Sequence, residues 1–415
     1  MSNSCTKKNL ISFLPALAAF ALVCFIRHFK FTMSTYNTTL LALNYEYGFL
    51  PRGLVGTLFH WATETFDRIE WNYMGAFNFS GAFTLLYYIL LFVFYKVCLN
   101  HCTEESKRNL KHLLVFLSIF AFPMYTTSVN FGCLDLYLGI ILLLCLILLV
   151  WNKAEWLIVP LGIIGMCINH DFIFTHAMLI GVLLIYKLLN QQGNKRIKYA
   201  LILLFFLIAN LSLFSHFENY TYESPTEIAN EIKVSAKALS ESGNSYGKTY
   251  LDEEILGNDL SLSASRLEQN EDNLQDLPVF LVLFSPYLVA MFYLFLRLSG
   301  DSDTTKAKRI SYLIVLFGSV CILPMLFNDV YYGRYMFQLV FYYIACFITF
   351  ISLGDNRVSN YFDLMKADMK KLTPMTFVWF LYPFLLTPFR AVAISSSIHD
   401  LAEVIFTELT YFIQP

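Results

Sequence analysis

The residues best suited to chemistry lie in one short segment, 44–56, which follows the first apolar stretch of the chain. Glu46 stands six residues before Arg52, on a backbone that two glycines and a proline allow to bend. A carboxylate suits general-base catalysis, and the planar fork of an arginine suits a phosphate. Because charge is costly beside lipid, the pair indicates a site. The alternative is that Arg52 only reaches toward lipid headgroups.

Two further candidates interrupt the apolar sequence. His170 and Asp171 are adjacent, so they form a possible acid–base pair; equally, Asp171 precedes an apolar run and is a plausible helix cap. Asp135 opens another apolar run and has the same two interpretations. We rank Glu46 first as catalytic base because it is close to Arg52 in the chain, Asp171 second and Asp135 third.

A second arginine, Arg334, lies in a polar and aromatic segment, 328–335. It is the other candidate for binding a phosphate, and the tyrosines around it suit stacking on sugar rings. The alternative is an ion pair within the loop, which contributes little stability. The expected substrate contacts are Tyr45, Tyr47, Asp135, Asp329, Tyr331 and Tyr332.

The composition indicates a membrane protein. Hydrophobic residues make up 57% of the chain and charged residues only 14%, against about 25% in soluble domains. The mean hydropathy is +0.55. A net charge of −2 argues against a nucleic-acid partner. The nine cysteines include no Cys-x-x-Cys pair and mostly lie in apolar runs, so we interpret them as buried hydrophobic side chains.

The apolar runs predict an all-α, polytopic integral membrane protein with about 11 transmembrane helices. The pair 156–169 and 172–188 is short and closely spaced, so it is either a tight hairpin or a broken helix. The expected spans cover 10–26, 75–97, 112–128, 134–151, 156–169, 172–188, 199–216, 278–297, 310–327, 335–353 and 374–393.

The distribution of lysine and arginine predicts the orientation. Basic residues concentrate in loops 99–111, 189–198, 299–309 and 354–373, which we place in the cytoplasm together with the N-terminus. An odd number of spans then leaves the C-terminus outside. The candidate acids, the histidine and both arginines all fall on the outer side. The first span lacks a small-residue cleavage site, so we expect it to be retained.

Two outer loops are long. The first, 27–74, contains an amphipathic stretch at 54–71 that is typical of a helix lying in the membrane interface. The other, 217–277 between spans seven and eight, has 13 acidic and 4 basic residues and two helix-like runs, 226–240 and 260–274. It is either a solvated acidic cap or a lid over the outer face. We therefore expect a seven-span module at 1–216, an acidic loop at 217–277, a four-span module at 278–393 and an outer tail at 394–415.

Motifs of several other classes are absent from the sequence. It contains no Walker loop, no Gly-x-Gly-x-x-Gly fingerprint and no His-Glu-x-x-His. An ATP-driven pump is therefore not indicated. Internal repeats, which mark many secondary transporters, are not evident either.

This layout resembles the GT-C glycosyltransferases, which use polyprenyl-phosphate-linked sugars on the outer face of the membrane. It is also similar to capsule and O-antigen polymerases, which have outer-loop arginines and a large outer loop. The run 48–56, Gly-Phe-Leu-Pro-Arg-Gly-Leu-Val-Gly, looks like segments of proteins encoded with bacterial surface polysaccharides. The resemblance covers the whole chain as topology.

The resemblance implies a transferase or polymerase of the bacterial cytoplasmic membrane. Its partners would be a polyprenyl-phosphate- or pyrophosphate-linked saccharide, membrane lipids and other polysaccharide-assembly proteins. The chain departs from GT-C proteins in two ways. Glu46 stands where they usually have a catalytic aspartate, and the Asp-x-Asp pair of metal-dependent members is missing. We therefore expect no cofactor, although a divalent metal stays open.

Three alternatives come from other classes. A flippase for lipid-linked oligosaccharides needs a cation-lined path, yet few charges lie within the spans. A membrane acyltransferase usually has its histidine at an inner or intramembrane site. A non-catalytic assembly subunit would tolerate changes at its outer acids.

Overall fold

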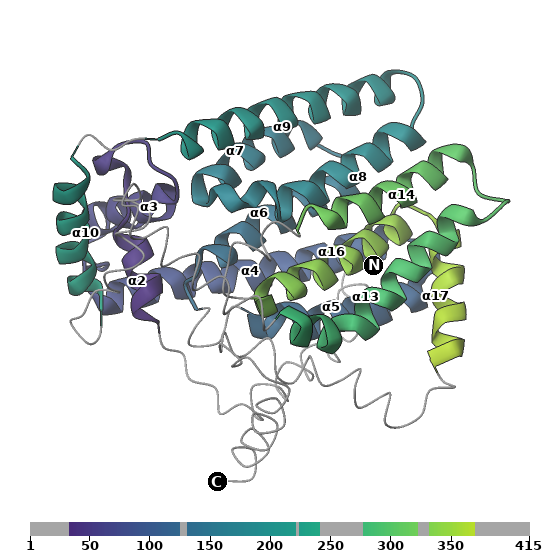
Figure 1. The fold of residues 1–415 in the computed structure, drawn as a ribbon, viewed down its shortest axis with the longest axis horizontal. Coiled ribbons are helices and arrows are strands. Elements are labelled where there is room, and N and C mark those ends of the chain that lie inside the picture. Colours follow the sequence, from purple (N-terminus) through teal and green to yellow (C-terminus); the bar gives the residue numbers. More distant parts are fainter. Residues whose placement is uncertain (1–32, 125–130, 221–223, 241–276, 323–331, 370–415) are drawn as a thin grey trace, which may run out of the picture. The chain divides into compact units, whose positions relative to one another are not determined.

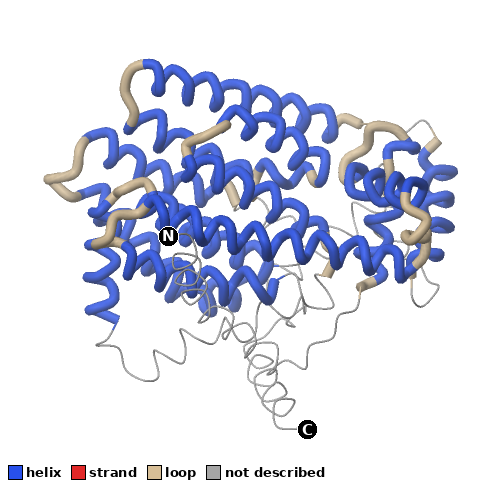
Figure 2. The backbone as a smooth tube through the Cα atoms, turned by 180° about the vertical axis from the view of Figure 1, so that it is seen from behind, coloured by secondary structure: helices blue, strands red, loops and turns tan. Residues whose placement is uncertain are grey.

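A computed structural model describes residues 33–124, 131–220, 224–240, 277–322 and 332–369. Within these residues every regular element is a helix, and the backbone consists of helices and loops alone (Figure 2). The predicted all-α class is confirmed for this part of the chain. The expected spans 10–26 and 374–393 and the helix-like run 260–274 lie outside it.

The helices form two compact units. The first contains α2 (Thr35–Ala42), α3 (Gly53–Thr65), most of α4 (Tyr73–His101), α6 (Leu134–Trp151), α7 (Ile158–Ile168), α8 (His176–Asn190), α9 (Asn194–Glu218) and α10 (Pro225–Leu239). The second contains the end of α4, α5 (Lys107–Met124), α13 (Leu277–Gly300), α14 (Lys306–Val320), α16 (Tyr332–Ser352) and α17 (Asn356–Met369). This grouping differs from the expected modules at 1–216 and 278–393, because α5 packs against α16 and α17.

Four stretches in the described part are long and apolar enough to cross a membrane. They are α4, α6, the stretch His170–Asn190 that ends with α8, and α9. This supports a membrane protein. Four further helices overlap expected spans, namely α5, α13, α14 and α16. They are not among the helices that are both long and apolar enough to cross a membrane. Figure 1 labels each of these helices.

The ambiguous pair of spans consists of two separate helices. α7 has 11 residues, which is about 16 Å at about 1.5 Å per residue and too short to cross a hydrocarbon core of about 30 Å. Asn169 ends it in an extended conformation, and a 3₁₀ turn, η3 (His170–Ile173), leads into α8. Both α7 and α8 pack against α6 and α9. The 3₁₀ turn η3 contacts α7, α8 and α9, so these helices hold it in place at one end of the bundle.

The amphipathic stretch of the first outer loop forms α3, which ends at Thr65 rather than at residue 71. Phe66 takes an extended conformation there and caps the helix through its N–H. One face of α3, including Val55 and Phe59, is buried, whereas Leu58 and Trp61 on another face are exposed. The helix-like run 226–240 is confirmed as α10, which packs against α2.

Gly56 allows the end of α2 and the start of α3 to approach at backbone distance. A Cβ atom at this position would lie 1.7 Å from the Leu43 carbonyl oxygen and 2.7 Å from that of Leu41. Neither oxygen belongs to a flexible side chain, so the backbone itself would have to move. This close contact fixes the segment between the two helices, which carries Glu46 and Arg52.

We expect Gly56→Ala to destabilise the protein by about 1–3 kcal/mol, the usual cost of overpacking a rigid contact. The measurement is thermal unfolding in detergent. Gly181→Ala is the matched control, because Gly181 lies in α8 and a Cβ there meets nothing within 4 Å. Equal melting temperatures for the two variants would show that the α2–α3 contact is loose.

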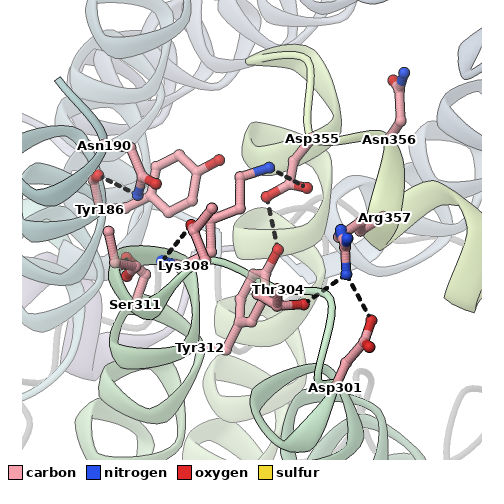
Figure 3. A network of polar contacts seen from close by, with 12 residues as sticks. Tyr186, Asn190, Asp301, Thr304, Lys308, Ser311, Tyr312, Asp355, Asn356 and Arg357 are labelled. Carbon is pink, nitrogen blue, oxygen red and sulfur yellow. Dashed lines mark hydrogen bonds and ion pairs between the residues drawn. The ribbon is translucent and has the colours of Figure 1, made fainter.

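The second unit is held together by ion pairs at one end of its helices (Figure 3). Asp355 is fully buried and accepts hydrogen bonds from Lys308 Nζ at 2.9 Å and from the Tyr312 hydroxyl at 2.7 Å. Arg357 donates to Asp301 Oδ2 at 2.8 Å. These contacts join the start of α14 and the segment before it to the junction between α16 and α17.

A third segment reaches the same end of this unit. Thr103 and Ser106, just before α5, donate to Asn356 Oδ1 at 3.2 and 3.3 Å. Asn109 donates to Asp363 Oδ2 at 2.7 Å. Of the loops expected in the cytoplasm, 354–373 therefore contacts both 99–111 and 299–309. Their assignment to a common side of the membrane stays a prediction.

Candidate functional site

The segment between α2 and α3 is tightly folded. Asn44 caps a 3₁₀ turn, η1 (Tyr45–Tyr47), by accepting a hydrogen bond from the Glu46 N–H at 2.8 Å. Gly48 has a φ of +108°. Arg52 has a φ of +67° in the left-handed region, which is costly for a residue with a Cβ. Such strain persists only where the surroundings fix the residue, and at Arg52 they do so through polar contacts.

Arg52 contacts η3, far away in the sequence. Its Nε donates to Asn169 Oδ1 at 3.2 Å, and its Nη2 lies 3.3 Å from Asp171 Oδ2. Asn169 also donates to Asp171 Oδ2 at 3.2 Å, so the amide holds both charged groups. The side chains of Arg52 and Asp171 are only 12% and 19% exposed. This is therefore a largely buried ion pair with a shared amide.

The cap of η3 is Asn169 and not Asp171. The Asn169 side chain accepts a hydrogen bond from the Asp171 N–H. The carboxylate of Asp171 instead faces Arg52. Of the two interpretations of Asp171, the contacts described here favour the site over the cap.

His170 lies beside this pair. Its Nε2 is 3.8 Å from Asp171 Oδ1 and 3.7 Å from Glu218 Oε1 at the end of α9. Its Nδ1 is buried and has no hydrogen-bond partner in the described part of the chain. The cluster Arg52, Asn169, His170, Asp171 and Glu218, here called the arginine–histidine cluster, thus combines residues from three separate segments.

Glu46 belongs to a different set of contacts. Its Oε1 lies 3.0 Å from His60 Nε2, and its Oε2 accepts a hydrogen bond from Asn44 Nδ2 at 3.2 Å. His60 also lies 3.3 Å from Glu64. The Glu46 side chain is 59% exposed. The structure therefore pairs Glu46 with His60, and it pairs Arg52 with Asp171.

Aromatic side chains lie next to the cluster. The Tyr45 hydroxyl donates to the Cys167 carbonyl at 3.4 Å, and burial raises the pKa of Tyr45, so the phenol stays neutral. Phe49 is 42% exposed and contacts Tyr45, His216 and Phe217. Burial, then the charges of Glu231 on α10 and of Glu46, raise the pKa of Tyr47.

The remaining candidates are not joined to the cluster by the described contacts. Asp135 is buried in the first turn of α6. Arg334 and Tyr332 lie in the first turn of α16, in the other unit. Asp329 and Tyr331 lie outside the described residues.

The opposite end of the same helices is rich in lysine. Lys187, at the end of α8, donates to Asn152 just after α6. Lys198, near the start of α9, donates to Glu155 Oε2 at 2.6 Å. Each helix from α7 to α9 therefore has one end in this lysine-rich region and the other near the arginine–histidine cluster. The stretch that ends with α8 is long enough to cross a membrane, and so is α9, whereas α7 is not. The assignment of these two ends to opposite sides of a membrane stays a prediction.

Glu155 provides a stability prediction for that end. Burial alone would raise the pKa of its carboxyl, but hydrogen bonds from Lys198 and Tyr199 outweigh it and hold the pKa below its usual value. A lowered pKa contributes stability above the unfolded pKa, and this is lost as the pH falls through the folded pKa. We expect Glu155→Gln to cost about 1–3 kcal/mol at neutral pH. The difference in melting temperature from the wild type should shrink as the pH falls below the ordinary pKa of a glutamate and through the lowered pKa of Glu155. A difference that stays constant would contradict the ionic origin.

The sequence did not indicate Glu218, Asn169 or His60. Glu218 is the last residue of a long apolar helix at its predicted outer end, and that position was the available signal. No group of three or more histidine, cysteine or acidic side chains in the described residues is arranged to hold a metal ion. Comparison with protein-family models, curated proteins and solved structures finds no match for this chain.

Proposed function

We propose that this protein is a membrane glycosyltransferase or polymerase that takes a sugar from a polyprenyl-phosphate-linked donor. We place it in the bacterial cytoplasmic membrane with about 11 spans, and its arginine–histidine cluster on the outer face. The orientation is supported by the basic loops, two of which contact the loop 354–373 within the second unit. It is also supported by the lysine-rich end of the first unit, opposite the cluster.

The observation that carries the proposal is the buried ion pair of Arg52 with Asp171. When a sugar leaves a lipid phosphate, negative charge develops on the phosphate oxygens. A guanidinium binds such oxygens through parallel N–H donors. Arg52 is already held in place by Asn169 and Asp171, so it needs little reorganisation when that charge appears.

The neighbouring groups suit the acceptor side of the reaction. His170 and Asp171 can take part in removing a proton from an acceptor hydroxyl, which is the role of a general base. Phe49, exposed beside Arg52 in the chain, offers an aromatic face to a sugar ring. The His60–Glu46 pair is more exposed than Arg52 and Asp171, so we assign it no part in the proton transfer.

The proposal is tested by supplying defined donors to the purified protein in lipid nanodiscs. The donors are polyprenyl-phosphate-linked monosaccharides, polyprenyl-pyrophosphate-linked oligosaccharides, sugar nucleotides and acyl thioesters. We expect transfer from a lipid-linked sugar alone. Consumption of an acyl thioester in its place would assign the same histidine and carboxylate to an acyltransferase. Consumption of no lipid-linked donor would overturn the proposal.

A further inference from the structure

The least satisfied atom of the arginine–histidine cluster is His170 Nδ1. It is buried, and no described residue forms a hydrogen bond with it. Buried polar atoms nearly always have partners, and leaving one without a partner is destabilising. The other nitrogen of the same ring has two charged neighbours. This asymmetry assigns different roles to the two nitrogens.

The neighbours of Nε2 decide where the ring carries its proton. Asp171 Oδ1 and Glu218 Oε1 both lie within 4 Å of Nε2. Ionised carboxylates only accept hydrogen bonds, so they favour a proton on Nε2. In the neutral ring, Nδ1 is then left with a lone pair and is an acceptor. Its missing partner is therefore a donor such as a hydroxyl.

The other groups around η3 do not change this assignment. Arg52, at the start of α3, faces Asp171 rather than the ring. On α8, His176 stacks on Phe172 and contacts Thr175. On α9, besides the Glu218 carboxylate, the apolar ring of Phe214 lies beside His170, at 6.4 Å between ring centroids.

We infer that His170 is the general base, and that its Nδ1 binds the hydroxyl group of the acceptor. This inference rests on the proposed function and assigns the proton transfer within it. Asp171 and Glu218 are then positioning residues, which orient the ring and stabilise the imidazolium ion. A carboxylate beside one ring nitrogen and a hydroxyl at the other is the arrangement of acid–base dyads in general.

The proton transfer accompanies formation of the new glycosidic bond. The acceptor hydroxyl gives its proton to His170 Nδ1 while its oxygen bonds to the anomeric carbon of the donor sugar. The bond from that carbon to the phosphate oxygen breaks, and the electron pair stays on the polyprenyl phosphate, whose charge Arg52 neutralises. The imidazolium then releases a proton to water; Glu218, with a side chain that is 51% exposed, connects the ring to solvent.

The test compares His170→Gln, which keeps a donor near the position of Nε2, with His170→Asn, which keeps a non-basic acceptor near that of Nδ1. We expect both to lose about 10²–10⁴-fold in kcat, because neither can take a proton. Both should still bind polyprenyl phosphate as the wild type does. The wild-type rate should fall at acidic pH, and this acid limb should be missing from any residual rate of the variants.

Glu218→Gln is the second variant, in case the histidine variants do not fold. It removes one of the two carboxylates beside Nε2 that orient the ring, so we expect kcat to fall while the KM for the lipid-linked donor stays that of the wild type. Turnover close to that of the wild type by either His170→Gln or His170→Asn would overturn the inference. It would leave the proposed function standing. A wild-type protein that turns over no lipid-linked donor would instead overturn the proposed function.

Discussion

Arg52→Lys is expected to lose about 10²–10³-fold in turnover while inserting and folding as the wild type does. Lysine keeps the positive charge but lacks the planar fork that contacts Asn169 and Asp171 together. An electrostatic donor to a developing oxyanion is typically worth this much in rate. The loss should appear in kcat, because the charge that Arg52 meets grows as the sugar leaves.

The measurement is initial rate with a polyprenyl-phosphate-linked sugar, together with the melting temperature in detergent. Arg297→Lys is the matched control, because Arg297 is exposed on α13 and contacts Tyr293 and Tyr361. If Arg52→Lys is as active as Arg297→Lys, Arg52 only anchors the loop to lipid headgroups. That is the alternative which the sequence left open.

The second large effect concerns the carboxylates of Asp171 and Glu46. We expect Asp171→Asn to lose at least about 10²-fold in turnover, because it removes both the partner of Arg52 and a charge beside His170. Glu46→Gln should keep most of its activity, since Glu46 is exposed and pairs with His60. Each substitution preserves shape and changes one charge, so the pair is matched.

The rates of both variants are compared at equal amounts of folded protein. Normal turnover by Asp171→Asn together with an inactive Glu46→Gln would identify Glu46, in the first outer loop, as the general base. That was the ranking favoured by the sequence, where only distance along the chain was available.

The sequence alone does not show which charged residues meet in the fold. Arg52 and Asp171 were both candidates, but nothing in a periodic apolar pattern states that they meet. Their contact depends on the left-handed backbone at Arg52 and on the short α7, which ends at Asn169. Glu46 is near Arg52 in the chain, yet η1 presents it to His60. Turn geometry therefore decided the pairing.

Helical positions were predicted better than their ends and partners. Apolar periodicity placed α4, α6, α8 and α9 close to their observed bounds, because burial in lipid or protein needs little more than length and hydrophobicity. It extended α3 too far, since the cap at Phe66 leaves no strong signal. Glu218 was missed because an acid that ends a span is usually solvated.

The central claim is that the arginine–histidine cluster faces the outside of the cell and binds a polyprenyl-phosphate-linked sugar. Its most direct test is cysteine labelling from one side of the membrane, on a background without other cysteines. Phe49→Cys reports on the cluster, because Phe49 is exposed and lies three residues before Arg52. Lys153→Cys reports on the exposed lysine-rich end.

We predict that a membrane-impermeant maleimide labels Phe49→Cys from the outer side only, and Lys153→Cys from the cytoplasmic side only. A polyprenyl-phosphate-linked sugar should slow labelling at position 49 and leave position 153 unchanged. Labelling of Phe49→Cys from the cytoplasmic side alone, or labelling there that the lipid-linked sugar does not slow, would contradict the claim.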